Sequence, residues 1–165
     1  MSDMKLATID PRTFRDVLGC HPTGVAVITA RSGTENIGLV VGSFTSISLD
    51  PPLVGFFPGK TSTTWPKIAA TKRFCVNVLA ADQTAICKRF ASKDADKFAG
   101  LDCADSPSGL PILKGVSAWV ECSIERATEI GDHYLVVGSV DALGAGEGTA
   151  PLVFHRGGYH CTGAI

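Results

Sequence analysis

Two long alternating segments joined by a short turn constrain the fold of this chain more than any other feature. Apolar and polar residues alternate through 118–130 and again through 133–143, which is the pattern of half-buried strands. Gly131-Asp132 between them has the composition of a two-residue hairpin turn. The sequence therefore predicts a long antiparallel hairpin near the C-terminus, of the kind that can close a β-barrel.

Strand patterns also dominate the rest of the chain. Apolar runs bounded by turn residues predict further strands at 23–30, 36–41, 43–49, 52–57, 74–79 and 151–155. The two runs on either side of Gly42 form either one long strand or two. With so many strands and few helices, an antiparallel barrel with peripheral helices is the expected architecture.

Three short helices are expected around this barrel. Asp10-Pro11 is a typical N-cap followed by a proline at the first helical position, and the helix extends to Gly19 with one apolar stripe. The stripe consists of Phe14, Val17 and Leu18. Residues 65–70 predict a second helix, Asp82 can cap a third that ends at Phe90, and residues 94–100 can add a turn.

The composition is that of an ordinary globular domain. The 165 residues fit a single domain, with 45% hydrophobic and 19% charged residues. A net charge of −1 gives no strongly basic face, so nucleic acid is not an expected partner. No run approaches the ~20 uninterrupted apolar residues of a membrane span. The first residues also lack the apolar core of a secretory signal, so we expect a cytoplasmic protein with no membrane contact.

Six cysteines are scattered along the chain without a CxxC pair or a zinc-finger spacing, so no metal site is predicted. Several lie inside apolar runs such as FCVNVL and WVECSI. Reduced, buried thiols in a cytosolic protein are the expected state.

The segment from Gly38 to Lys67 carries the most chemical information. Hydroxyl-bearing residues cluster at 43–48 and 61–64, on the two sides of the apolar run 53–57. A flat, partly apolar ligand with a phosphorylated tail needs this combination, and a flavin is such a ligand. The alternative for 61–64 alone is a solvated loop that caps the helix beginning at Trp65.

Two segments imitate nucleotide-binding motifs without having their spacing. Residues 144–148 are rich in glycine but lack the GxGxxG pattern, and the glycines of 55–61 lie one residue too close for a P-loop. Lys60 and the hydroxyls after it can still bind a phosphate by side-chain donation. A hydrolase triad is disfavoured because no GxSxG segment is present.

Further motifs resemble a known family in their order and spacing. GSFTSISLDPPLV at 42–54 is followed by KTSTTWP, RFCVNVLA, KFAG, GDHYLVVG and PLVFHRGGYH, the last ending at residue 160. Over residues 10–160 the chain resembles the flavin reductase-like family of FMN-binding split barrels. These include the small reductase components of two-component flavin monooxygenases. The resemblance implies one mainly β domain over residues 1–165, an antiparallel Greek-key split β-barrel with a few peripheral helices.

The resemblance also implies a set of ligand-binding residues. Residues expected along the flavin ring edge or in the same signature are Val41, Gly42, Ser43, Ser46 and Ser48. Those expected near the phosphate or the ADP part are Lys60, Ser62, Thr63, Trp65, Lys88, Arg89 and Phe90. His133 is the histidine expected beside flavin and nicotinamide, with Phe98 and Tyr159 bordering the nicotinamide pocket. On spacing alone, His133 could equally be a solvent-exposed residue at a hairpin end.

The function implied is reduction of FMN or FAD by NADH or NADPH, with reduced flavin passed to a separate monooxygenase. A homodimer with each flavin site near the subunit interface is implied as well. The first alternative is a non-catalytic flavin- or haem-binding split-barrel protein. A second is an oxidase of the pyridoxamine-phosphate type, but the sequence has no dense arginine cluster for a second phosphate.

Overall fold

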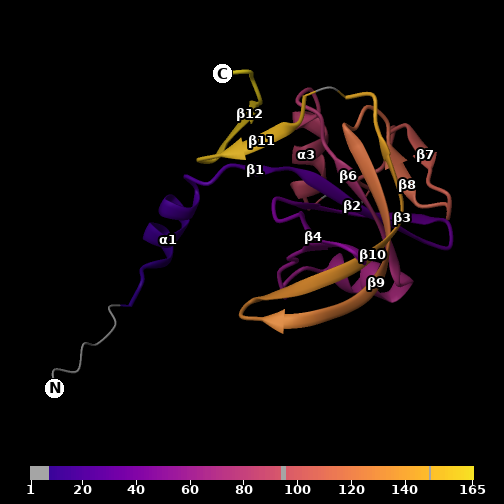
Figure 1. Ribbon diagram of the computed structural model, residues 1–165, viewed down its shortest axis with the longest axis horizontal. Helices are drawn as coiled ribbons and strands as arrows, with labels where there is room; N and C mark the ends of the chain where they lie inside the picture. Colours follow the sequence, from indigo (N-terminus) through magenta and orange to yellow (C-terminus); the bar gives the residue numbers. More distant parts are fainter. Residues whose placement is uncertain (1–7, 94–95, 149) are drawn as a thin grey trace.

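A computed structural model describes residues 8–93, 96–148 and 150–165. Strands are the main regular structure of the described chain, and three helices lie at its periphery (Figure 1). The elements in chain order are α1 (Pro11–Leu18), β1 (Thr23–Gly24), β2 (Ala26–Ser32), β3 (Glu35–Val41), β4 (Thr45–Leu49), β5 (Pro52–Phe56), α2 (Trp65–Thr71), β6 (Arg73–Val78), α3 (Thr84–Ala91), β7 (Cys103–Asp105), β8 (Pro111–Leu113), β9 (Ala118–Ile130), β10 (His133–Ala145), β11 (Leu152–His155) and β12 (Gly158–Cys161).

Seven strands form one curved antiparallel sheet in the order β3-β2-β6-β9-β10-β5-β4. Neighbours such as β6–β9 and β5–β10 are distant in sequence, as a Greek-key arrangement requires. The edge strands β3 and β4 are consecutive in the chain and are connected by residues 42–44. The prediction of a mainly β, antiparallel split barrel is confirmed, and the seam between β3 and β4 is its split.

The predicted long hairpin forms with the expected turn. β9 and β10 pair from Ile130↔His133 to Ala118↔Ala145, and Gly131 in the turn has φ +58°, which favours glycine. Two register shifts interrupt the ladder, one of them at Gly138. A Cβ on Gly138 would lie 2.6 Å from the Phe74 ring, so the glycine is needed for close packing there. Shifts of this kind bend strands and help a sheet to curve.

The core consists of two clusters on the two faces of β2. Ala26, Ile28 and Ala30 face the barrel interior, where Phe56, Phe74 and the helix α2 fill the space. Val25 and Val27 face the opposite cluster, which includes residues of α3, β8 and β11. Because strand side chains alternate between faces, burial on both sides explains why residues 25–28 are all apolar.

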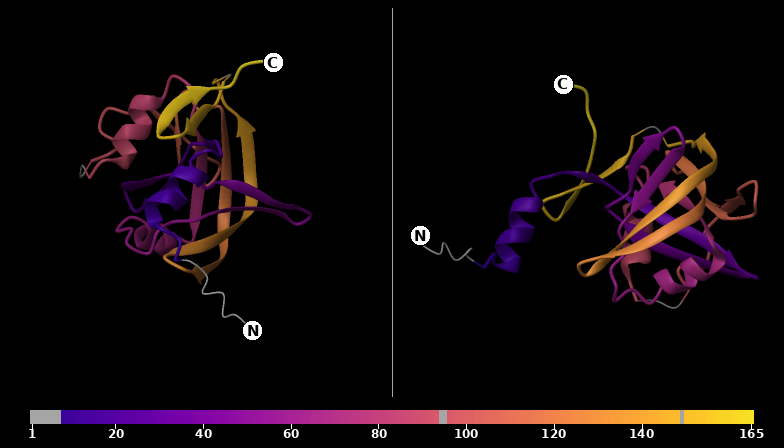
Figure 2. Two further views of the ribbon diagram at one scale, coloured as in Figure 1. Left: turned by 90° about the vertical axis from the view of Figure 1, so that its left-hand side faces the viewer. Right: turned by 60° about the horizontal axis from the view of Figure 1, so that its bottom comes forward.

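The helix α1 lies outside the barrel together with the hairpin β11–β12 (Figure 1), and the right-hand view of Figure 2 shows the projection of α1. The predicted N-cap is confirmed, since Asp10 Oδ2 accepts a hydrogen bond from Thr13 N at 2.8 Å. No residue of α1 is buried in the chain, and the predicted apolar stripe Phe14, Val17 and Leu18 is more than half exposed.

The other expected elements form with small shifts at their ends, and three short strands were not predicted. The strands missed are β7, β8 and β12. The third helix begins at Thr84 with Gln83 as its N-cap residue, so the prediction that Asp82 caps it is wrong. Gln83 Oε1 instead accepts from Ala80 N at 2.9 Å, which fastens the loop before the helix. The expected turn at 94–100 begins at two residues outside the described ranges.

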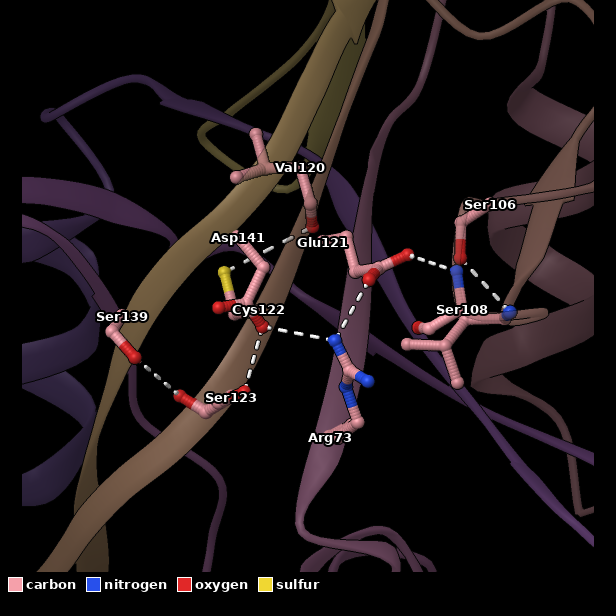
Figure 3. Close-up of polar contacts among 10 residues, drawn as sticks. Arg73, Ser106, Ser108, Val120, Glu121, Cys122, Ser123, Ser139 and Asp141 are labelled. Carbon is pink, nitrogen blue, oxygen red and sulfur yellow. Dashed lines mark hydrogen bonds and ion pairs between the residues drawn. The ribbon is translucent and has the colours of Figure 1, made fainter.

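A buried carboxylate on β9 forms polar contacts that link neighbouring strands of the sheet (Figure 3). Glu121 on β9 is 2% exposed and pairs with Arg73 at 3.0 Å, while Ser108 N donates to its other oxygen at 3.1 Å. Arg73 also reaches Asp141 on β10 at 3.1 Å. These contacts join β6, β9 and β10 to the loop before β8. Burial acts to raise the pKa of Glu121, but hydrogen bonds from Ser106 and Ser108 and the Arg73 charge together hold it below the usual value.

Candidate functional site

A recess of about 360 Å³ lies at the seam of the barrel. Its walls come from the end of β3, the connection to β4, the loop after β5 and the first residue of β10. The lining residues are Leu39, Val40, Val41, Gly42, Ser43, Phe57, Pro58, Gly59 and His133. Three of the residues expected at the flavin ring edge therefore lie in one recess with the predicted histidine.

The edge position of β3 gives this recess polar backbone groups. Among the strands of the described ranges β3 pairs only with β2, so within them it has no sheet partner on its other side. Backbone N–H and C=O groups at a sheet edge are available to a ligand, as are those of the irregular residues Gly42 and Ser43. The apolar side chains of the same walls can cover a flat ring.

The hydroxyl of Ser43 is oriented by the loop on the opposite wall. Phe57 N donates to Ser43 Oγ at 2.9 Å, which ties the two walls together. Because the oxygen accepts this bond, the hydroxyl hydrogen remains available for donation to a ligand. Ser43 is thus both a structural link and a candidate ligand donor.

His133 is fixed at the rim of the recess by three neighbouring contacts. Gly59 and His133 form an antiparallel bridge, flanked by Lys60 N donating to Asp132 O and Tyr134 N donating to Pro58 O, both at 2.9 Å. The ring itself is half exposed, and its Nδ1 lies 2.7 Å from Asp132 Oδ1. This hydrogen bond and the His133 charge hold the pKa of Asp132 below its ordinary value. An ionised carboxylate only accepts, so Nδ1 carries the proton in this contact and Nε2 is left for a ligand.

A second, larger groove of about 920 Å³ adjoins the recess along β3. Its lining combines threonine hydroxyls, three lysines, two acidic residues and one aromatic ring. The residues are Thr34, Glu35, Asn36, Ile37, Gly38, Thr61, Thr63, Thr64, Lys67, Ser92, Lys93, Asp96, Lys97, Phe98 and Ala99. Hydroxyl and ammonium donors of this kind suit a phosphate-bearing ligand.

Comparison with known proteins shows the family of this chain. The family model described as "Flavin reductase like domain" matches residues 18–163 of the chain. The chain belongs to this family. Four of the motifs recognised in the sequence, GSFTSISLDPPLV, KTSTTWP, KFAG and GDHYLVVG, contribute residues to the recess or the groove, whereas RFCVNVLA and PLVFHRGGYH do not.

Individual flavin reductase-like proteins match over nearly the whole chain. A flavin reductase from Pseudomonas putida is 51% identical over 96% of this chain and 94% of its own length. The reductase subunit HsaB of a flavin-dependent monooxygenase from Rhodococcus jostii (strain RHA1) is 48% identical, with 92% and 77% covered. The structure of the NADH:FAD oxidoreductase SgcE6 from Streptomyces globisporus C-1027, in complex with NAD and FAD fragments, superposes with a TM-score of 0.85. It is 35% identical, with 92% of this chain and 94% of that chain covered.

Of the residues expected near the phosphate, only Thr63 lines either space. Lys60 instead pairs with Glu129 on the β9–β10 hairpin at 2.7 Å, and this contact raises the pKa of Lys60. Ser62 Oγ accepts from the backbone N–H of Trp65, the first residue of α2, at 3.1 Å. The Trp65 side chain is buried in the core, edge-on to the Phe56 ring.

Residues of α3 lie behind the groove rather than in its lining. Phe90 is 1% exposed and packs edge-on against Phe98 at 5.1 Å, which places Phe98 at the groove wall. Arg89 donates to the Ala99 carbonyl at 2.6 Å, and Lys88 is exposed on the helix surface. Phe98 therefore belongs to the larger groove.

Three further expected residues, Ser46, Ser48 and Tyr159, line neither space. Tyr159 packs against Phe154, and its hydroxyl accepts from Cys87 Sγ at 3.5 Å. Ser46 is exposed on the edge strand β4.

Sequence reasoning missed several residues that the structure brings to the two spaces. Phe57, Pro58 and Gly59 line the recess, although the sequence indicated only an apolar strand followed by a turn. Lys67 and Lys93 line the groove from segments far apart in the sequence. Asp132 was noted only as a turn residue, yet its position directly before His133 was a signal that it could orient that ring.

Proposed function

We propose that the chain acts as one domain and is an NAD(P)H-dependent flavin reductase that supplies reduced FMN or FAD to a partner monooxygenase. The recess at the barrel seam carries this proposal, because it joins apolar walls, edge-strand backbone donors and His133. The reactions and assemblies for which the three relatives are named support the same activity.

The donor set of the recess fits a flavin. Leu39, Val41 and Phe57 offer apolar cover for a tricyclic ring, and the backbone of Gly42 and Ser43 offers donors for its polar edge. When bound, the flavin accepts a hydride and the nicotinamide supplies it, which is the chemistry of the cofactors themselves.

In this proposal the residues of the chain bind the flavin and the nicotinamide and orient them toward each other. We assign the polar ring edge to the backbone of Val41–Ser43 and to the Ser43 hydroxyl, because donors there stabilise negative charge on a reduced ring. His133 borders the open side of the recess, and Asp132 holds its ring with Nε2 available to the nicotinamide. No side chain has to abstract a proton from carbon, which agrees with a site that lacks a buried base.

We also propose a cytoplasmic homodimer. The apolar face of α1 has no partner within the described chain, and a second copy is the simplest cover for it. The hairpin β9–β10 extends past the barrel toward the side on which α1 projects (Figure 1), so both border the region where a partner would lie.

All six cysteines are free, which supports the proposed cytoplasmic location because the cytoplasm is a reducing compartment. Among the described residues no helix could span a membrane.

The direct test is oxidation of NADH and NADPH by the purified protein, followed by the loss of absorbance of the reduced nicotinamide. We expect consumption of at least one nicotinamide that depends on added FMN or FAD. Binding of flavin without consumption of either nicotinamide would refute the reductase and favour a flavin carrier.

Replacing Ser43 by alanine should weaken flavin binding about tenfold. One hydrogen bond contributes about 0.5–1.5 kcal/mol net, and the upper end corresponds to roughly a factor of ten. Dissociation constants from flavin fluorescence titration would measure the change. Ser46→Ala is the matched control, because Ser46 lies on β4 outside both spaces and should leave affinity unchanged. Equal affinity of wild type and Ser43→Ala would remove this hydroxyl from the site.

A further inference from the structure

The recess and the larger groove meet at Gly59, between the side chains of His133 and Thr61. Gly59 and His133 line the recess, and Thr61 lines the groove. A Cβ added to Gly59 would lie 3.8 Å from His133 Nε2 and 3.9 Å from Thr61 Oγ1. Both polar atoms therefore adjoin the space that this glycine leaves free. This junction, bounded by Gly59, Thr61 and His133, has one polar atom on each side.

The backbone at Gly59 sets the spacing of these two side chains. Ser62 N donates to Gly59 O at 3.0 Å, which closes a β-turn with Thr61 at its third position. Gly59 also forms the antiparallel bridge with His133. The turn that carries Thr61 and the strand that carries His133 are thus joined by backbone contacts at a single residue.

The two polar atoms have complementary hydrogen-bonding roles. With Nδ1 donating to the Asp132 carboxylate, the neutral His133 ring presents Nε2 as an acceptor. Thr61 is exposed, and its hydroxyl has no hydrogen-bond partner among the residues that the structure describes, so it is available to donate. The junction therefore suits a group that donates at one end and accepts at the other. An ionised phosphate or carboxylate only accepts and does not match Nε2.

A primary carboxamide fits both the roles and the spacing. It has an NH2 donor and a C=O acceptor, about 2.3 Å apart. With a hydrogen bond of ~2.9 Å at each end, it bridges an acceptor and a donor that are up to roughly 8 Å apart. The contact distances at Gly59 keep Nε2 and Oγ1 within that span.

We propose that Thr61 and His133 together bind the carboxamide of the nicotinamide, with the Thr61 hydroxyl donating to its carbonyl oxygen and Nε2 accepting from its NH2 group. The inference rests on the proposed function, because it takes the nicotinamide to approach a flavin in the recess. The carboxamide is attached next to the ring carbon that carries the hydride, so two contacts to it fix that carbon over the flavin. Thr61 is thus a further substrate-binding residue, and the pair determines which nicotinamide analogues react well.

Replacing Thr61 by valine, which keeps the shape but lacks the hydroxyl, should lower kcat/KM for the nicotinamide dinucleotide about tenfold. Thr61→Ser, which restores a hydroxyl, should recover most of this loss. Flavin affinity, measured by fluorescence titration, should stay within twofold of wild type in both variants. Thr128→Val is the matched control, because Thr128 is exposed on β9 and lines neither space.

Gly59→Ala tests the junction without removing either polar group. The added methyl group would lie at ordinary contact distance from both atoms, and the φ of Gly59 is not positive, so the backbone accepts alanine. The methyl group occupies the place of the carboxamide, and we expect the KM for the dinucleotide to rise at least tenfold. A loss of flavin affinity in place of this KM effect would assign the junction to the flavin and overturn the inference.

A substrate analogue separates the two hydrogen bonds. The reduced 3-acetylpyridine form of the dinucleotide keeps the carbonyl oxygen but carries a methyl group in place of the NH2 group. Thr61→Val should lower kcat/KM by the same factor for the natural dinucleotide and for the analogue. His133→Ala should lower it about tenfold more for the natural dinucleotide, because only that substrate donates to Nε2. The intrinsic reactivity of the analogue is the same with every variant and cancels in this comparison.

The outcomes distinguish the inference from the proposed function. Unchanged kcat/KM in Thr61→Val, or equal factors for both substrates in His133→Ala, would refute carboxamide binding and leave the reductase standing. Failure of wild type to consume either nicotinamide would refute the proposed function itself. Thermal melting checks that each variant folds, and the exposed position of Thr61 keeps its two variants informative even where Gly59→Ala is unstable.

Discussion

Replacing His133 by alanine is expected to lower kcat/KM for the nicotinamide about a hundredfold while flavin affinity changes little. His133 lies at the open side of the recess, and loss of a group that positions a reactant costs roughly this factor. Stopped-flow measurement of flavin reduction by NADH, with flavin prebound and oxygen excluded, isolates the step. The thermal midpoint should stay close to that of wild type, because the His133 side chain is 48% exposed and only its backbone is part of the sheet.

Two further variants, both at Asp132, test whether this residue acts by orienting the His133 ring. Asp132→Asn keeps a side chain that can accept from His133 Nδ1, whereas Asp132→Ala removes the contact, so only the alanine variant should approach the effect of His133→Ala. His160→Ala is the control, because His160 is exposed on β12 and lines neither space. Unchanged reduction kinetics in His133→Ala would exclude this residue from the nicotinamide site.

The sequence predicted the elements that are determined by residues close to one another in the chain. The hairpin at Gly131-Asp132 and the bounds of β9 follow from alternation and turn composition, and the start of α1 follows from its cap. Parts of the two hydroxyl-rich segments also line the proposed spaces, since Ser43 lines the recess and Thr61, Thr63 and Thr64 line the groove. The physical causes of these elements lie within a few residues of each other in the chain.

Tertiary contacts decided the features that sequence reasoning missed. Lys60 lies in a promising run, but a glutamate 69 residues away takes its ammonium group. The groove combines Glu35, Thr63 and Phe98, which only the barrel topology brings together. The stripe of α1 correctly indicated an apolar face, yet periodicity cannot tell whether the chain itself or another molecule covers that face.

Glu121→Ala is expected to lower the free energy of unfolding, measured with urea, by about 3 kcal/mol. Removing one partner of a buried ion pair costs about 3–5 kcal/mol. The lower end applies because the Arg73 side chain is 41% exposed and keeps Asp141 as a second partner (Figure 3). Glu129→Ala is the matched control from the same strand. Its pair with Lys60 is exposed, so its loss should cost less than about 1 kcal/mol.

The same carboxylate predicts a specific dependence of stability on pH. Because the folded-state pKa of Glu121 lies below its unfolded value of about 4.5, its contribution is complete above that pH and is lost as the pH falls through the folded-state pKa. Wild type should therefore lose more stability than Glu121→Gln over this acidic range, since glutamine cannot titrate. Parallel pH profiles for the two proteins would show that Glu121 is not stabilised as an anion. The ion pair with Arg73 would then contribute nothing to holding β6 and β9 together.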